Sequence, residues 1–226
     1  PPGPGEVRVR MLASGVCHSD LHVLDGDWAR PAPVAMGHEG AGIVEALGPG
    51  VGARAGDPAA GDLVVLAWTA PCGACPACAR GEGFLCADPR GGGHRRAPAD
   101  VRLRRPDGTP VGVYSGIGTM ATHQVVAAEA AIRVDPSLPA AEAALLGCAV
   151  TTGVGAVTRT AGVRAGETVV VVGLGGVGLS AVMGAVLARA ARIVAVDRVP
   201  AKLELARALG ATDAVLAGDG PATRAA

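Results

Sequence analysis

Four of the six cysteines lie in one short segment, CGACPACARGEGFLC, with the spacing C-x2-C-x2-C-x7-C. Gaps of two residues, filled partly by glycine and proline, let tight turns bring neighbouring thiolates onto one ion. Four thiolates form a closed tetrahedral zinc site, which is structural because no position stays open for a substrate. The alternative is a pair of disulfides in an exported protein. We predict a structural zinc site made by the four residues Cys72, Cys75, Cys78 and Cys86.

The two other cysteines stand in separate motifs, GVCHSDLH around Cys17 and LLGCAVTTG around Cys148. Between them, GHEGAGIV places His38 and Glu39 directly before an expected strand. Two cysteines and one histidine leave the fourth position of a tetrahedral zinc ion open, as a catalytic site requires. Taken singly, each cysteine is compatible with buried apolar packing, and His38 with a hydrogen-bonded core histidine. The joint pattern favours a catalytic zinc site because it gives all six cysteines a role.

A third motif, Gly173-Leu174-Gly175-Gly176-Val177-Gly178, has the G-x-G-x-x-G spacing of a pyrophosphate-binding turn. The spacing alone is a weak signal, since the chain contains 35 glycines. Here it follows an apolar run, residues 168–172, typical of a strand buried on both faces of a parallel sheet. Asp197 comes 19 residues after the last glycine, where it would bond the ribose hydroxyls and repel a 2′-phosphate. This predicts NAD rather than NADP, a preference that Arg198 beside it would soften.

Two kinds of structure must position these residues. In the first part, alternating or β-branched segments predict a β-rich domain, with a helix opened by Pro139 near its end. The expected strands are residues 6–11, 62–68, HQVV (123–126) and AIRV (131–134). In the second part the pattern is β-α-β-α-β, one half of a dinucleotide-binding sheet. Its expected elements are a strand at 168–172, a helix at 176–190, a strand at 192–197, a helix at 201–210 and a strand from 213.

Five motifs in this order, GVCHSD, GHEGAGIV, the four-cysteine segment, LLGCAVTTG and VVGLGGVG, resemble the zinc-dependent medium-chain dehydrogenase/reductase family. The resemblance is to its alcohol dehydrogenase branch and covers residues 5–218. It implies an α/β fold with a β-rich partner domain: a GroES-like catalytic domain, 1–148, then the first half of a Rossmann NAD-binding domain, 149–226. It implies an oxidoreductase that transfers hydride from a primary or aromatic alcohol to NAD, reversibly, with an aldehyde product. The lack of a signal segment in the sequence leads us to expect a cytoplasmic protein. Two zinc ions per subunit, one catalytic and one structural, and NAD are the implied cofactors.

The resemblance also implies roles for residues around the catalytic zinc. Cys17, His38 and Cys148 would be its ligands, and Glu39 a nearby carboxylate that approaches the metal when a ligand exchanges. Asp20 would orient the ligating histidine.

Further roles follow from the same resemblance. Ser19 would receive the substrate's proton, and His22 would stand at the far end of that proton relay. His18 would face the coenzyme pyrophosphate, and Trp68 would line the substrate pocket. Lys202 matches a position near the adenosine ribose, although a lysine on a helix is more often simply solvated.

Two other functions stay open. The first is a dehydrogenase of the same family that oxidises the S-hydroxymethyl adduct of formaldehyde with a small thiol. The basic stretch 90–110, interpreted as a solvated loop, could contact such an anionic adduct, whereas Trp68 favours primary or aromatic alcohols. The second is a truncated, non-catalytic zinc-binding fragment, because family members extend beyond both ends of this sequence. We expect the fragment alone to be inactive, and the full-length protein to be a homo-oligomer.

Charge and hydropathy limit the partners. Twenty basic and twenty acidic residues cancel, so a nucleic acid or an anionic membrane surface is not expected as a partner. Residues 169–188 carry no charge and are long enough to cross a bilayer. Five glycines interrupt that stretch, and no signal segment precedes the folded part, so we expect no membrane partner. A small-molecule alcohol or aldehyde is the expected substrate.

Overall fold

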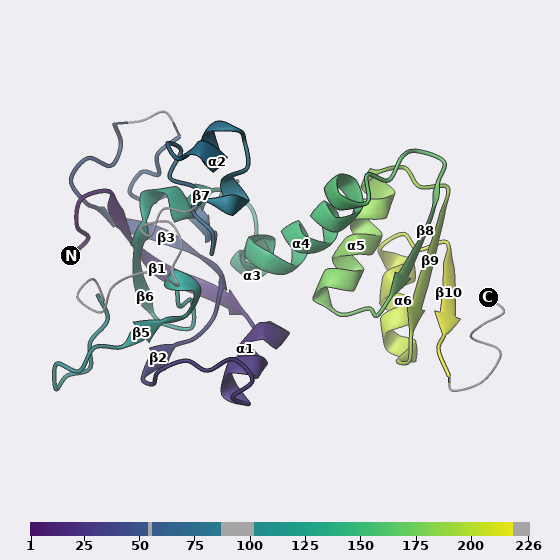
Figure 1. Ribbon diagram of the computed structural model, residues 1–226, viewed down its shortest axis with the longest axis horizontal. Coiled ribbons are helices and arrows are strands. Elements are labelled where there is room, and N and C mark those ends of the chain that lie inside the picture. The colour runs from purple at the N-terminus through teal and green to yellow at the C-terminus, as the bar shows by residue number, and fades with distance from the viewer. Residues whose placement is uncertain (54–55, 87–101, 219–226) are drawn as a thin grey trace. The chain divides into compact units, whose positions relative to one another are not determined.

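The computed structural model describes residues 1–53, 56–86 and 102–218. The chain forms two compact units, Pro1–Cys148 and Ala149–Ala226 (Figure 1). The first unit is built mainly of strands and the second alternates strands with helices, so the predicted α/β fold with a β-rich partner domain is confirmed.

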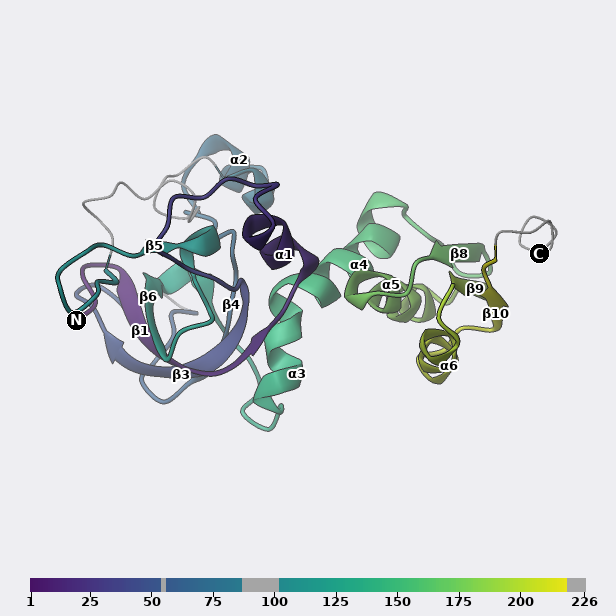
Figure 2. The ribbon, with the colours of Figure 1, turned by 90° about the horizontal axis from the view of Figure 1, so that it is seen from below.

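The first unit is organised by a five-stranded antiparallel sheet with the order β6-β1-β3-β4-β7. Its strands are β1 (Glu6–Gly15), β3 (Glu39–Leu47), β4 (Leu63–Leu66), β6 (His123–Ala127) and β7 (Ala131–Arg133). All four strands predicted in this region are therefore confirmed. The long strands β1 and β3 curve strongly (Figure 2), and their pairing carries two register shifts, which increase bending. A small parallel pair, β2 (Val34–Ala35) and β5 (Gly112–Val113), lies outside this sheet.

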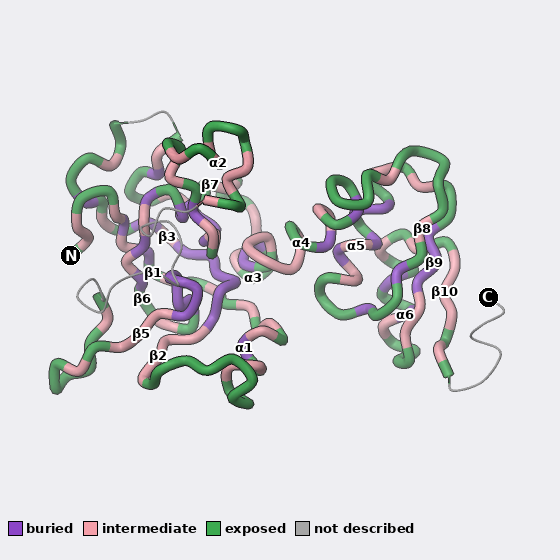
Figure 3. Tube along the Cα trace, viewed as in Figure 1, coloured by how far each residue is buried: buried purple, intermediate pink, exposed green. Residues whose placement is uncertain are grey.

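The alternation along β1 separates the core from the surface. Val7 and Val9 are fully buried, while Arg8 and Arg10 reach Glu45 on the outer face at 3.4 and 3.1 Å. Burial is concentrated along the sheet strands (Figure 3). The buried cluster on the inner face comprises Val7, Val9, Val44, Val64, Leu66, Ala70, Ile117, Val126, Ala128, Ala130 and Ala131.

Short helices complete this unit. Within the described residues they are α1 (His18–Leu24), α2 (Pro76–Ala79), α3 (Ala140–Leu145) and the 3-10 turns Gly83–Leu85, Tyr114–Gly116 and Ala128–Ala130. The helix α3 begins after Pro139, as predicted, and buries Ala143 and Ala144 against Ala41 and Val65 of the sheet. It continues as a π-helical segment, Leu146–Val150.

The second unit contains a three-stranded parallel sheet with the order β10-β9-β8. Its elements are β8 (Thr168–Val172), α5 (Gly176–Leu187), β9 (Arg192–Asp197), α6 (Pro200–Ala208) and β10 (Asp213–Leu216), preceded by α4 (Thr151–Gly155) and a π-helical segment, Ala156–Thr160. The predicted β-α-β-α-β order is confirmed. Both α5 and α6 pack on one face of the sheet, in a cluster that includes Val171, Ile193 and Leu203.

Within the described residues, helices cover one face of this sheet. The strand at 168–172 was expected to be buried on both faces, but Val170 is 58% and Val172 79% exposed. Alternate residues of a strand point to opposite faces, and only the face that carries Val169 and Val171 packs against the helices.

The uncharged stretch 169–188 forms β8, the glycine turn and α5 rather than one continuous helix. A different helical run, Ala140–Thr160, is long and apolar enough to cross a bilayer by length and composition. This is weak evidence for a membrane span, because the core helices of globular proteins pass the same test.

Candidate active site and zinc centres

The antiparallel pairing of β1 with β3 brings two candidate metal ligands together. The last pair of this ladder joins Gly15 to Glu39. Cys17 follows two residues after Gly15, and His38 stands one residue before Glu39. The end of β1 and the start of β3 are therefore neighbours, although 21 positions separate the two ligands in the sequence.

The third donor arrives from the π-helical segment. Gly147 lies against the carbonyl oxygen of Leu66, at the end of β4, so closely that a Cβ there would stand 2.8 Å from that oxygen. This contact holds the next residue, Cys148, beside the start of β3. One ligand atom from each of Cys17, His38 and Cys148 lies within 4.8 Å of the others. A π-helical turn is rare and is frequently found at functional sites.

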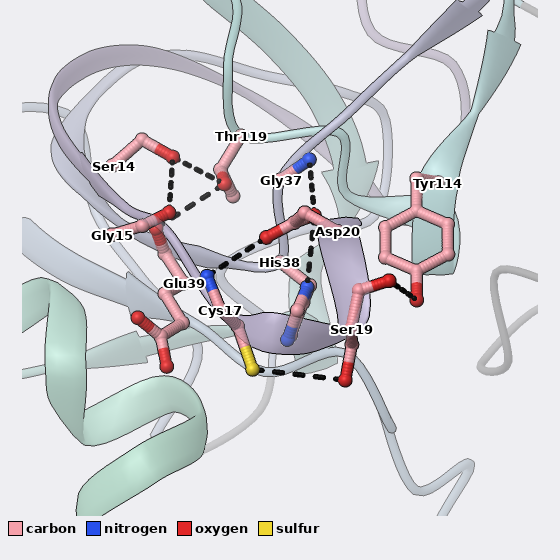
Figure 4. Close-up of polar contacts among 10 residues, drawn as sticks. All are labelled: Ser14, Gly15, Cys17, Ser19, Asp20, Gly37, His38, Glu39, Tyr114 and Thr119. Carbon is pink, nitrogen blue, oxygen red and sulfur yellow. Dashed lines mark hydrogen bonds and ion pairs between the residues drawn. The ribbon is translucent and has the colours of Figure 1, made fainter. Parts of the chain in front are cut away.

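Asp20 connects the two sides of this cluster (Figure 4). It is only 3% exposed; its Oδ2 accepts the backbone N–H of Cys17 at 3.0 Å and its Oδ1 that of Gly37 at 3.2 Å. Its Oδ1 also lies 3.4 Å from Nδ1 of His38, an ion-pair distance without hydrogen-bond geometry. Because Nδ1 faces the carboxylate, Nε2 is the ring nitrogen available to a metal.

Glu39 is buried to 2% exposure beside the cluster. Its carboxylate occupies the space that a side chain at Gly15 would need. The backbone at this point is fixed by Thr119, whose hydroxyl donates to the carbonyl of Glu39 at 3.2 Å and pairs with the hydroxyl of Ser14 at 2.8 Å. The carboxylate of Glu39 is thus close enough to raise the pKa of Cys148, while its backbone stays in β3.

The donor set fits a zinc ion. Burial raises the pKa of Cys148 to about 12, and the proximity of Cys17 and Glu39 adds to that rise. Such a pKa means that bringing two thiolates and a carboxylate together is unfavourable unless a cation compensates their charge. Two sulfurs and one imidazole suit Zn²⁺ and leave one tetrahedral position open.

The four-cysteine segment forms a separate cluster, with all four sulfurs within 4.8 Å of one another. Sγ of Cys72 lies 4.0 Å from that of Cys78, and Sγ of Cys75 lies 3.9 Å from that of Cys86. Thiolates bound to a tetrahedral zinc at about 2.3 Å lie about 3.8 Å apart, so these spacings fit the metal. All six cysteines are free, so the disulfide alternative is wrong for this structure.

Backbone N–H groups also point at the sulfurs of this cluster. The N–H of Cys72 donates to Cys86 and that of Cys75 to Cys72, each at 3.3 Å. Desolvation raises the pKa of Cys78 to about 11, opposed by a backbone hydrogen bond from Gly73. These donors would stabilise metal-bound thiolates.

The expected proton-relay residues lie on α1. The hydroxyl of Ser19 is 3.6 Å from Sγ of Cys17 (Figure 4). Nδ1 of His22, one turn further on, contacts a carboxylate oxygen of Asp27 at 2.8 Å. His18 is exposed at the start of the helix, with its ring 5.1 Å from that of His22.

Tyr114 was missed by the sequence analysis. Its ring meets the His38 ring edge-on at 5.5 Å, and its hydroxyl donates to the backbone carbonyl of Ser19 at 3.4 Å. It therefore links a candidate metal ligand to the expected proton acceptor. The available signal was its rarity, as it is the chain's single tyrosine. Trp68, the expected pocket residue, follows β4 and is 40% exposed.

The glycine turn lies between β8 and α5, as expected for a dinucleotide site. Gly173 has φ +88°, a conformation that favours glycine. A side chain at Gly178 would collide with the carbonyl oxygen of Gly173, so the helix packs on the turn only with glycine there. Gly175 precedes the helix, and nothing lies within 4 Å of a Cβ placed on it, so that side of the turn is open to a ligand.

Asp197 ends β9 beside this turn. Its Oδ2 accepts the N–H of Leu174 at 2.7 Å and its Oδ1 that of Val199 at 2.9 Å, and these bonds lower its pKa. The ammonium of Lys202 lies 3.9 Å from Oδ2. Arg198 is exposed. Asp197 is thus held ionised and anchored to the turn.

The basic stretch 90–110 is described from residue 102 onward, and its remainder lies outside the described residues. Arg102 pairs with Glu6 at 2.9 Å, and Arg104 donates to the carbonyl of Gly108 at 3.2 Å. Two of the basic side chains therefore already have partners within the chain.

Comparison with known proteins agrees with this geometry. A family model for the alcohol dehydrogenase GroES-like domain matches residues 3–139. An S-(hydroxymethyl)glutathione dehydrogenase from Photobacterium damsela subsp. piscicida is 42% identical over 97% of this chain and 59% of its own length. An NDMA-dependent alcohol dehydrogenase from Amycolatopsis methanolica is 41% identical over 100% of this chain and 60% of its own length.

A solved structure shows the same architecture. The alcohol dehydrogenase zinc-binding domain protein from Burkholderia ambifaria matches with a TM-score of 0.86 at 40% identity, over 99% of this chain and 60% of that one. The chain thus spans about three fifths of the length of these relatives. With its GroES-like domain and the start of a Rossmann domain, the chain belongs to the zinc-dependent medium-chain dehydrogenase/reductase family, in its alcohol dehydrogenase branch.

Proposed function

We propose that the protein to which this chain belongs is a zinc-dependent, NAD-linked alcohol dehydrogenase that converts a primary or aromatic alcohol to its aldehyde. The observation that carries the proposal is the convergence of Cys17, His38 and Cys148 within 4.8 Å, with one tetrahedral position left for a substrate oxygen. A zinc ion held there would supply Lewis acidity that lowers the pKa of a bound hydroxyl towards neutrality.

The chain's own residues would then manage the proton and the metal ligands. Ser19 is placed to accept the proton of the substrate hydroxyl, since its Oγ lies 3.6 Å from a ligand sulfur. Asp20 faces Nδ1 of His38, which would leave Nε2 to hold the zinc ion, and Tyr114 packs on the same ring. These contacts fix the positions of the acceptor and of one ligand before substrate arrives.

The glycine turn and Asp197 support NAD as the hydride acceptor. The backbone of the turn is exposed at Gly173, Gly175 and Gly176, where amides could approach a pyrophosphate at the start of α5. The ionised carboxylate of Asp197 favours ribose hydroxyls over a 2′-phosphate. We further propose a cytoplasmic homo-oligomer with no nucleic-acid or membrane partner.

A second candidate is oxidation of an S-hydroxymethyl thiol adduct, because a 42% identical relative carries the name S-(hydroxymethyl)glutathione dehydrogenase. The partners already held by Arg102 and Arg104 weaken the case for a basic contact with such an adduct in the described part of the chain.

The test measures turnover of benzyl alcohol and of a formaldehyde–glutathione adduct, each with NAD and with NADP. It uses the zinc-loaded protein at the full length of its relatives. We expect the higher kcat/KM with benzyl alcohol and NAD. A higher value with the adduct would favour the second candidate, and no turnover with any of the four pairs would refute both. Cys148→Ser should abolish turnover and leave the four-cysteine zinc in place.

A further inference from the structure

We propose that Asp27 is a positioning residue for His22: it holds the proton of the imidazole on Nδ1 and so leaves Nε2 as the proton acceptor. The catalytic use of this tautomer rests on the proposed function, whereas the contact that selects the tautomer does not. The carboxylate oxygen of Asp27 lies 2.8 Å from Nδ1. Because an ionised carboxylate can only accept a hydrogen bond, the nitrogen that faces it must carry the proton.

The end of α1 is shaped to bring Asp27 to this place. Gly26, with φ +85°, reverses the chain after the helix, a conformation that favours glycine. The backbone N–H of Trp28 then donates to the carbonyl of His22 at 3.1 Å. The segment that follows α1 is therefore folded back along the helix, and Asp27 meets the imidazole from that side.

The ring of His22 is also held on its faces. The centroid of the Trp28 ring lies 5.0 Å from that of His22, tilted by 31°, and the ring of His18 stands at 5.1 Å, edge to face. With Asp27 on Nδ1, three side chains fix the imidazole in one orientation. Of the described side chains that contact this ring, Asp27 is the anion and His18 the titratable base.

Fixing the proton on Nδ1 matters because the two ring nitrogens are not equivalent in a proton relay. A neutral imidazole accepts a proton only at the nitrogen that lacks one. In the tautomer that Asp27 selects, the Nε2 lone pair accepts the incoming proton, and the carboxylate stabilises the imidazolium that results. In the other tautomer Nε2 carries a hydrogen and cannot accept one. A carboxylate partner for a catalytic histidine is known to have this effect.

The direct test reads the tautomer without any turnover. Chain with ¹⁵N-labelled histidine is studied by long-range ¹H–¹⁵N correlation at about pH 8.5, where imidazoles are ordinarily neutral. We expect His22 to be mainly the Nδ1–H form. Asp27→Asn should convert it mainly to the Nε2–H form, since the amide can donate to Nδ1. Asp25→Asn, which removes an equal charge two residues away, should leave the tautomer unchanged.

Two outcomes would overturn the proposal: an unchanged tautomer in Asp27→Asn, or an equal shift in Asp25→Asn. Unchanged signals from His38 and His123, which lie in the sheet region away from Asp27, show that each variant is folded. In the longer active protein, Asp27→Asn should lower kcat/KM about ten- to a hundredfold at constant zinc content, and Asp27→Glu should restore part of it. The tautomer result stands whether or not alcohols prove to be the substrate, so failure of the two proposals can be told apart.

Discussion

Adding one methyl group at Gly147 tests how the third zinc donor is positioned. A Cβ there would stand 2.8 Å from the carbonyl oxygen of Leu66, whereas ordinary contact begins at 3.4 Å. The π-helical segment must therefore move by the difference, about 0.6 Å, and Cys148 moves with it. Ligand distances in zinc sites hold to about 0.2 Å, so this displacement is roughly three times the tolerance. Overpacking of this kind costs about 1–3 kcal/mol, which corresponds to roughly five- to 150-fold weaker zinc binding if the whole cost falls on the metal-bound state.

The assay measures zinc per chain after dialysis against a graded series of chelator concentrations. Wild type should retain both ions longest, while Gly147→Ala should release one ion at about a tenfold lower chelator concentration and keep the other. Gly155→Ala is the matched control, because nothing lies within 4 Å of a Cβ at that helical glycine. If Gly147→Ala and Gly155→Ala released zinc alike, the contact with β4 would not be what places Cys148.

Three further outcomes are expected. Cys75→Ser should reduce bound zinc to about one ion per chain and leave the Cys17 site filled, as elemental analysis would show; loss of both ions would contradict two independent sites. Gly178→Ala should weaken NAD binding by roughly tenfold or more in a calorimetric titration, since its methyl collides with the turn, and unchanged affinity would contradict that packing. The hydrogen-bonded ion pair with Arg192 lowers the pKa of Asp213 to about 2 from 3.8. The stability that this pair adds to the folded chain is therefore present above pH 3.8 and is lost as the pH falls towards 2. Asp213→Asn should therefore lower the urea midpoint of unfolding at about pH 5, and the difference in midpoint from wild type should be smaller at about pH 3. The same difference at both pH values would contradict this.

Much of the fold was predictable because its signals are local. The alternation of valine and arginine in β1 requires only that one face be buried, and the glycine turn between β8 and α5 is encoded in six consecutive residues. The strand at 168–172 shows the limit of such reasoning. Its uniform apolar character indicates a buried strand, but the exposure of Val170 and Val172 depends on which elements cover each face of the sheet.

The contacts within the site were less predictable because they too depend on tertiary packing rather than on local sequence. Helix α1 has only seven residues, too few for an apolar repeat to be recognised. The contact of Tyr114 with His38 joins positions 76 residues apart, and spacing does not encode it. Asp27 lies close to His22 in the sequence, yet their contact depends on the reversal at Gly26.

The two cysteine clusters depend on the fold in opposite ways. The four sulfurs of the structural cluster lie within 15 consecutive residues, and the turns between them suffice to bring them together. The proposed catalytic cluster joins Cys17 to Cys148 across 131 positions, and the chain entropy lost in closing such a loop must be offset by the sheet itself. Its geometry therefore depends on the register of β1, β3 and β4 and on the contact of the π-helical segment with β4. A substitution that shifts this register would disturb the catalytic donors and spare the structural ones, because only the catalytic donors are placed by the sheet.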